Sequence, residues 1–207
     1  MSNFYNFGKY LNLDRWNSYW YQIFEILDLK PESVLEIGIG DGVVSDYIKK
    51  NYPNINYKSA DFEEKLNPDI ILNLRDEKLD IPNVSFDIVC AFEVLEHLPF
   101  DRFENILMEF SRISKKYIII SLPYWGRHFS FAMKLPFFKK IKFQFKSNFL
   151  AKKHIINSEH FWEIGKRDYS MKKIKKCINN KNFKILKKYI CFESPYHYFL
   201  VLEKKHE

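Results

Sequence analysis

Cysteine is scarce in this sequence, and its scarcity excludes a disulfide-based scaffold. The 207 residues include three cysteines, Cys90, Cys177 and Cys191, and none has the spacing of a metal-binding cysteine set. Secreted scaffolds of this kind depend on many paired cysteines, whereas a reducing cytoplasm keeps thiols free. We therefore predict a cytoplasmic protein with three buried thiols.

Long apolar runs are also missing. No run approaches the ~18 residues that a membrane-spanning helix requires. The first ten residues, MSNFYNFGKY, lack the apolar segment of a signal peptide. With 46% apolar residues the chain can nevertheless bury a core, which excludes a disordered protein. Its length predicts one α/β domain over residues 1–207, with a modest insertion.

Acidic residues are rare in the second half of the chain. Residues 111–207 contain 23 Lys and Arg but 6 Asp and Glu, whereas residues 1–110 contain 10 and 20. A cationic half favours an anionic substrate or surface, such as a phosphate, a sugar nucleotide, a nucleic acid or a lipid headgroup. A lysine-rich face in contact with solvent is the alternative interpretation.

A glycine-rich turn is the most informative segment that the sequence contains. Residues 33–42, SVLEIGIGDG, begin with an apolar run typical of a buried strand and lead into a helical pattern. Gly38, Gly40 and Gly42 permit positive φ angles and close approach of a ligand to the backbone. The dinucleotide fingerprint requires a glycine at the sixth place, where this sequence has Val43. A helix N-terminus still favours a bound ligand here, and a turn without a ligand is the alternative.

An acidic residue follows the next strand. The pattern predicts a strand over residues 55–60 that ends at Asp61, 19 residues beyond Gly42. A carboxylate at this position can accept hydrogen bonds from both hydroxyls of a nucleoside ribose. Phe62 could stack on the base. A solvated turn aspartate is the alternative.

The remaining pattern alternates strands and helices, which predicts a parallel sheet with right-handed crossovers and ligands at the strand carboxyl ends. The first helix, residues 14–28, has Asp14 as its expected N-cap. Its aromatic face is expected in the core, with Tyr19 or Trp16 at a ligand pocket as the alternative. We also predict strands over residues 68–74, 85–92, 117–122, 183–192 and 196–202, and helices over 100–111 and 168–179.

Together, VLEIGIGDG, Asp61, SFDIVCAFEVLEHL and ISLP resemble a class I S-adenosylmethionine-dependent methyltransferase of the methyltransferase-11 type. The resemblance covers about residues 13–123. It implies a Rossmann-like, doubly wound, mostly parallel seven-stranded sheet with an antiparallel last strand, and S-adenosylmethionine as methyl donor. The cofactor-binding residues that it implies are Glu36, Gly38, Gly40, Gly42, Asp61, Phe62, Asn73 and Leu74, with Phe92 and Glu93 at the methionine part.

The segment Glu93-x-x-Glu96-His97 has two interpretations. Carboxylates and an imidazole on one short turn suit a divalent cation, and some small-RNA and ubiquinone-pathway methyltransferases use a similar E-x-x-E-H. Many relatives with the same residues hold no metal. We therefore favour a structural hydrogen-bonding role for His97 and predict no metal.

Residues 123–167 are predicted to form a lid after the fifth strand. The lid is expected to pack its aromatic side chains on the core; a membrane-surface patch and a basic-aromatic nucleic-acid face are the alternatives. Lys134, Lys139, Lys140, Lys142 and Lys146 are interleaved with these apolar residues: Phe129, Phe131, Leu135, Phe137, Phe138, Ile141, Phe143, Phe145 and Phe149.

The same half supplies the candidate substrate contacts, Tyr124, Arg127 and Trp162. His128 or His160 is the candidate base for a hydroxyl acceptor. We predict methyl transfer to a small anionic or glycosyl acceptor. An RNA-modifying methyltransferase and a non-catalytic S-adenosylmethionine-binding protein are the alternatives.

Overall fold

The computed structural model describes residues 5–137, 139–156, 159–179 and 183–205. Across these residues, seven strands form one sheet in the order β3-β2-β1-β4-β5-β9-β8. All neighbouring strands pair in parallel except β9, which is antiparallel to both β5 and β8. The predicted sheet with an antiparallel last strand is thus confirmed. The strands are β1 (Ser33–Ile37), β2 (Asn56–Asp61), β3 (Ile70–Ile71), β4 (Phe86–Phe92), β5 (Ser114–Pro123), β8 (Phe183–Ile190) and β9 (His197–Lys204).

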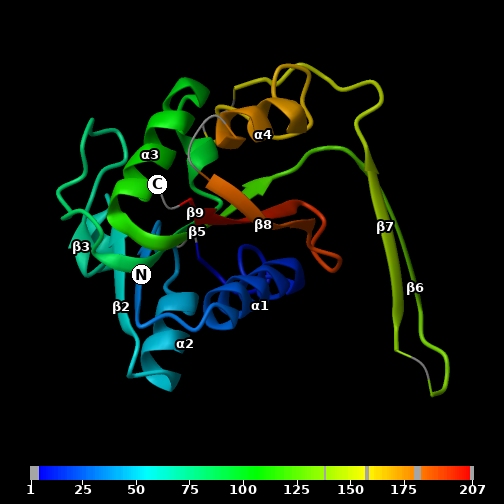
Figure 1. Ribbon diagram of the computed structural model, residues 1–207. Helices are drawn as coiled ribbons and strands as arrows, with labels where there is room; N and C mark the ends of the chain where they lie inside the picture. The colour runs from blue at the N-terminus through cyan, green and yellow to red at the C-terminus, as the bar shows by residue number, and fades with distance from the viewer. Residues whose placement is uncertain (1–4, 138, 157–158, 180–182, 206–207) are drawn as a thin grey trace.

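Helices cover both faces of this sheet (Figure 1). One face packs against α1 (Leu13–Asp28) and α2 (Val43–Asn51), and the other against α3 (Phe103–Ile113) and α4 (Met171–Asn179). Alternate strand residues serve the two layers, because successive side chains point to opposite faces. The strand ends are connected in part by the short 3-10 helices η1 (Glu64–Leu66), η2 (Leu95–His97) and η3 (Phe100–Arg102).

The core takes a different face of α1 from the one that the sequence predicts. Trp16, Trp20 and Phe24, spaced four residues apart, lie on the outer side and are exposed. The buried face holds Tyr19 and Ile26 together with polar residues. The helix is capped by Asn12, whose side chain accepts from the backbone N–H of Arg15 at 3.0 Å, and not by Asp14.

Glu25, one of the polar residues in this face, has partners on the far edge of the sheet. Glu25 accepts from Lys187 Nζ and from the Tyr189 hydroxyl of β8, each at 2.8 Å. Burial of a charged group is tolerated when it is hydrogen-bonded and paired in this way. These contacts fix which stripe of α1 faces inward.

Two further predictions can be compared with the structure. Cys90, Cys177 and Cys191 are all free and buried, as predicted. The strand predicted over residues 68–74 is reduced to β3, because side chains at both ends replace the strand pairing. The Asp69 carboxylate accepts from the Ser59 N–H, and the Asn73 side chain accepts from the Arg75 N–H two residues further on. None of the described helices combines the length and apolar character needed to cross a membrane.

The segment after β5 forms a two-stranded antiparallel hairpin, β6 (Arg127–Met133) and β7 (Ile141–Ser147). The hairpin projects from the body as a separate arm (Figure 1). Its aromatic side chains are exposed, so the expectation that they pack on the core is wrong. Phe138, one of the predicted lid residues, lies outside the described residues.

Candidate functional site

The glycine turn lies where β1 ends and α2 begins. Gly38, Gly40 and Gly42 have φ angles of 87°, 58° and 79°, a region that favours glycine. A Cβ on Gly38 would lie 2.2 Å from Val94 Cγ2, in the loop that follows β4. Glycine at this position therefore lets the loops after β1 and β4 approach each other closely.

Asp61 joins this turn to the end of β2. Its Oδ2 accepts from the backbone N–H of Ile39 at 3.1 Å, and its Oδ1 accepts from that of Glu63 at 3.0 Å. A carboxylate has about four acceptor positions, so further donors can be accommodated. Phe62, the next residue, is 71% exposed.

The predicted adenine-binding edge is only partly present. Phe62 and Asn73 line a surface hollow of about 310 Å³ beside β3. Leu74 does not line this hollow, and its side chain is buried in the core cluster beside α3. The hollow is completed by Ile70, Ile71, Leu72, Asp76, Leu79 and Asp80.

Glu36 lies inside the sheet layer. It is buried in β1 and accepts from the Tyr57 hydroxyl of β2 at 2.9 Å. Burial raises the pKa of Glu36 to about 8. Its contact in the structure is with the neighbouring strand, which is a supporting role, and its contact with the cofactor stays a prediction.

Glu93 begins the loop after β4 and adopts a positive φ of 54°, which is unusual for this residue type. Its backbone N–H donates to Ser121 O of β5 at 3.1 Å. Burial raises the pKa of Glu93 to about 8. The neighbouring Phe92 is buried against Phe199 of β9, with ring centroids 6.0 Å apart, so the structure places it in the core.

A histidine missed by the sequence analysis faces Glu93. His197 Nε2 lies 3.9 Å from Glu93 Oε2, and its Nδ1 is 2.7 Å from the Ser194 hydroxyl. Burial lowers the pKa of His197 to about 3. This ring is therefore neutral at ordinary pH.

Glu96, His97 and His160 form a second group, with one ligand-type atom from each lying within 4.8 Å of the others. Glu96 is fully buried, and neither carboxylate oxygen has a hydrogen-bond partner among the described residues. Burial raises the pKa of this carboxyl above its usual range. The His97 ring donates from Nδ1 to Glu159 O, the structural bond that the sequence analysis favours.

His160 is held between two glutamates. Its Nδ1 donates to Glu163 Oε1 at 3.1 Å, and its Nε2 lies 4.0 Å from Glu96 Oε1. The Tyr196 hydroxyl donates to the same Glu163 oxygen at 2.9 Å. A carboxylate on Nδ1 fixes the tautomer in which Nε2 is the basic nitrogen.

The other predicted substrate and base residues have different positions. Trp162 is fully buried and donates from Nε1 to Leu98 O at 3.0 Å, so it belongs to the core and does not line an acceptor site. Tyr124 is buried beside Tyr198. Arg127 and His128 lie on the hairpin, where the His128 ring bonds Gln144 at 3.1 Å.

The N-terminal segment contributes Tyr19, which the sequence analysis gives as an alternative pocket residue, and Arg15, which it does not single out. Tyr19 donates to both oxygens of Asp41, at 2.8 and 2.7 Å, and so ties α1 to the glycine turn. The Arg15 guanidinium lies 4.7 Å from the Tyr10 ring centroid and acts electrostatically to lower the pKa of Glu93, although burial dominates there. No spacing rule predicts these contacts, which depend on how α1 docks.

Comparisons with known proteins agree with this arrangement. The model of a family described as methyltransferase domain matches residues 15–168. Comparison with curated proteins gives no match. Among solved structures, the chain is similar to magnesium protoporphyrin IX methyltransferase from Synechocystis PCC 6803 with bound S-adenosylhomocysteine. That match has 13% identity, a TM-score of 0.65, and coverage of 99% of this chain and 90% of the other.

Two further structures extend the range of activities among the similar folds. One is 1,6-didemethyltoxoflavin-N1-methyltransferase from Burkholderia thailandensis, at 13% identity and TM-score 0.59, covering 93% of this chain and 78% of that one. The other is small RNA methyltransferase HEN1, at 14% identity and TM-score 0.60, covering 100% of this chain and 27% of that one. The family match spans most of the chain, which therefore belongs to the methyltransferase domain family and has the Rossmann-like fold of class I S-adenosylmethionine-dependent methyltransferases.

Proposed function

We propose that the chain transfers a methyl group from S-adenosylmethionine to a small anionic or glycosyl acceptor. The observation that carries the donor assignment is the bond from Ile39 N–H to Asp61, which sets a glycine turn and a carboxylate side by side at adjacent strand ends. Structures of similar fold, described above, hold S-adenosylhomocysteine. When bound, S-adenosylmethionine would supply an electrophilic methyl group on its sulfonium.

Each residue of the proposed cofactor site has a separate task. Asp61 accepts from the ribose hydroxyls, which are a matched pair of donors for one carboxylate. The open space at Gly40, where a Cβ would meet no atom within 4 Å, leaves room for a ligand against the backbone. Phe62 and Asn73 offer a ring face and an amide to the base in the hollow beside β3.

His160 is the proposed base for a hydroxyl acceptor. Its Nδ1–H is held by Glu163, so Nε2 can take a proton while the Glu163 carboxylate stabilises the imidazolium that forms. Positioning of the acceptor accounts for much of the rate in such an in-line displacement. Arg15 supports an anionic acceptor, because its positive charge acts on Glu93, whose own negative charge is suppressed by burial.

A divalent cation on Glu96, His97 and His160 is the second candidate feature of this site. The observation that favours it is the fully buried Glu96 carboxylate, whose oxygens have no hydrogen-bond partner among the described residues. Mixed carboxylate and imidazole ligands suit cations such as Mn²⁺. In that arrangement Nε2 of His160 would be a ligand and not the base.

The proposal is tested by calorimetric titration with S-adenosylhomocysteine, followed by methyl transfer from labelled S-adenosylmethionine to two fractions of a cell extract. We expect micromolar binding and label in the small-molecule fraction. Label in the RNA fraction alone would assign an RNA acceptor. Tight binding without product from either fraction would favour a non-catalytic protein, and absence of binding would refute the donor.

A further inference from the structure

The β6–β7 hairpin has two faces of different chemistry. Cross-strand register places Phe129 opposite Phe145, Phe131 opposite Phe143, and Met133 opposite Ile141. Because strand side chains alternate between faces, all six share one side of the ribbon. The opposite side carries His128, Ser130, Ala132, Lys142, Gln144 and Lys146.

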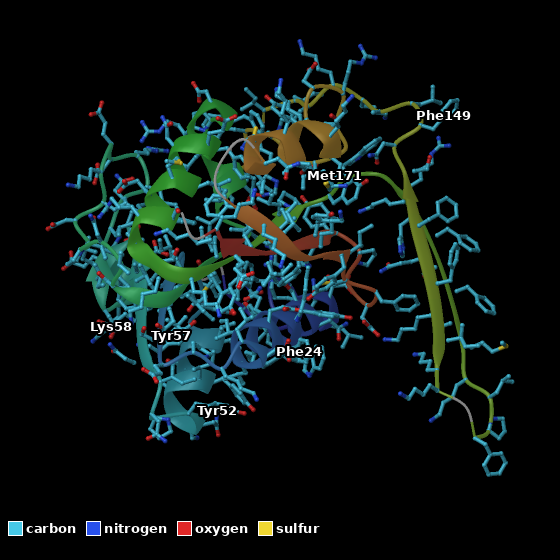
Figure 2. The ribbon with its side chains drawn as sticks, viewed as in Figure 1. Phe24, Tyr52, Tyr57, Lys58, Phe149 and Met171 are labelled. Carbon is cyan, nitrogen blue, oxygen red and sulfur yellow. The ribbon has the colours of Figure 1, made fainter. Side chains whose placement is uncertain are left out.

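The polar face is the one that contacts the body of the protein. Lys146 Nζ donates to Pro195 O at 2.7 Å, Gln144 Nε2 donates to Ile190 O at 2.7 Å, and Lys142 forms an ion pair with Glu193 at 2.5 Å. The apolar face is therefore directed away from the body. Figure 2 shows ring side chains on the outer side of the arm, and Phe149 lies near its base.

The six apolar side chains remain substantially exposed, at 38% to 57%. At the end of the arm, Leu135 is also exposed and Phe137 is completely so. Monomeric soluble proteins rarely present a contiguous apolar surface of this kind unless it serves an interaction. The outer face of the hairpin is thus an interaction surface.

The charge of the same segment limits which partner can cover it. No Asp or Glu occurs between Glu109 and Glu159, and residues 127–148 contain one arginine and five lysines. Three of these, Lys134, Lys139 and Lys140, lie at or beside the turn that joins the strands. A second copy of the chain would oppose one basic arm to another, whereas an anionic surface would complement both the charge and the apolar face.

We propose that the β6–β7 hairpin docks the protein on an anionic lipid surface. The unpaired outer backbone groups of a two-stranded ribbon are not tolerated in hydrocarbon. The arm therefore lies in the headgroup region, with its rings inserted about 5–10 Å, and the turn lysines contact lipid phosphates. RNA is disfavoured because the face made by the three pairs from Phe129–Phe145 to Met133–Ile141 has no cation between its side chains and includes two residues without rings.

The test is sedimentation of the full chain with vesicles of phosphatidylcholine alone or with 30% phosphatidylglycerol by mole. We expect binding to the anionic vesicles, weakened by added salt. Phe129 and Phe145 form a ring pair with centroids 5.7 Å apart, and replacing both by Gln should reduce the partition coefficient at least tenfold. Replacing Lys139 and Lys140 by Gln should reduce it about fivefold for each lysine.

The control is another exposed aromatic pair, Tyr47 of α2 and Tyr52 directly after it, with ring centroids 6.4 Å apart. Figure 2 shows Tyr52 on the side of the molecule away from the hairpin. Their double replacement by Gln should leave vesicle binding unchanged, and all variants should keep the thermal midpoint of the parent. The proposal is overturned if the parent chain ignores anionic vesicles or if the Phe129 and Phe145 variant binds them equally well. If the chain does not bind vesicles, dimerisation that depends on these rings would assign the face to a second copy of the chain. Salt-sensitive retention on RNA without vesicle binding would assign it to RNA.

Discussion

The backbone N–H of Ile39 donates to the Asp61 carboxylate across 3.1 Å, and this bond connects the loop after β1 to the end of β2. The two strands are neighbours in the sheet, paired from Ser33 with Asn56 to Ile37 with Ala60. Asp61 is therefore both a structural acceptor and the proposed partner of the ribose. This double role means that replacing it affects the loop and the ligand together.

Replacing Asp61 by alanine should weaken S-adenosylhomocysteine binding by about 1.5–3 kcal/mol, the range for hydrogen bonds to a charged group. The measurement is isothermal titration calorimetry at fixed salt. The Asp61→Asn variant keeps one carbonyl oxygen for Ile39 and should lose less affinity. An affinity of the alanine variant equal to that of the parent would remove Asp61 from the site.

Gly38 and Gly40 should respond differently to alanine. A methyl group on Gly38 meets Val94 Cγ2 at 2.2 Å, so Gly38→Ala should lower the free energy of unfolding by about 2–4 kcal/mol through overpacking and the positive φ. A second change, Val94→Ala, removes the clash and should restore part of that loss. Urea denaturation measures both.

Gly40→Ala provides the contrast, because its Cβ would enter open space at a φ of 58°. We expect a loss of stability of about 1–2 kcal/mol from the left-handed conformation and a larger loss of cofactor affinity. Equal affinity in Gly40→Ala and the parent would show that the cofactor does not approach this part of the turn.

Glu36 should make the stability fall with rising pH. Burial raises its pKa in the folded state to about 8, against an ordinary value of 4.5. Between these two values the folded state holds a proton that the unfolded state has released. The free energy of unfolding should therefore decrease by about 1.4 kcal/mol per pH unit from this one group.

The Glu36→Gln variant keeps an acceptor for the Tyr57 hydroxyl but cannot ionise. Its stability relative to the parent should rise from pH 5 to pH 8 and then level off. Urea denaturation at several pH values gives this difference. A difference that stays constant across the range would show that Glu36 ionises normally in the folded protein.

The sequence predicts the parts of this site that are local. The glycine turn, Asp61 and the order of strands follow from short patterns, because period-two and helical spacing are set by neighbouring residues. Trp162 could not be placed this way, since its burial depends on contacts with Leu98 and with Phe103 of α3, about 60 residues away. The proximity of His160 to Glu96 has the same origin.

The hairpin gives a sequence signal that was available but incomplete. Apolar residues alternate with polar or small ones at 129, 131 and 133 and again at 141, 143 and 145, which is typical of strands. Alternation identifies two faces but not which one is buried. Here Lys146, Gln144 and Lys142 find acceptors around the β8–β9 turn, and these contacts turn the apolar face outward.

Removal of divalent cations tests the cluster of Glu96, His97 and His160. If this cluster binds a cation, the chelator-treated protein should bind Mn²⁺ in an electron paramagnetic resonance titration, and Glu96→Gln should weaken that binding at least tenfold. Asp101→Asn, at an exposed carboxylate on η3, is the matched control and should change nothing. Methyl transfer should then be lost in chelator and restored by Mn²⁺. Absence of Mn²⁺ binding together with full activity in chelator would contradict the cation site. Glu96 would then be a buried neutral acid and His160 the base, roles that neither residue can have while it is a cation ligand.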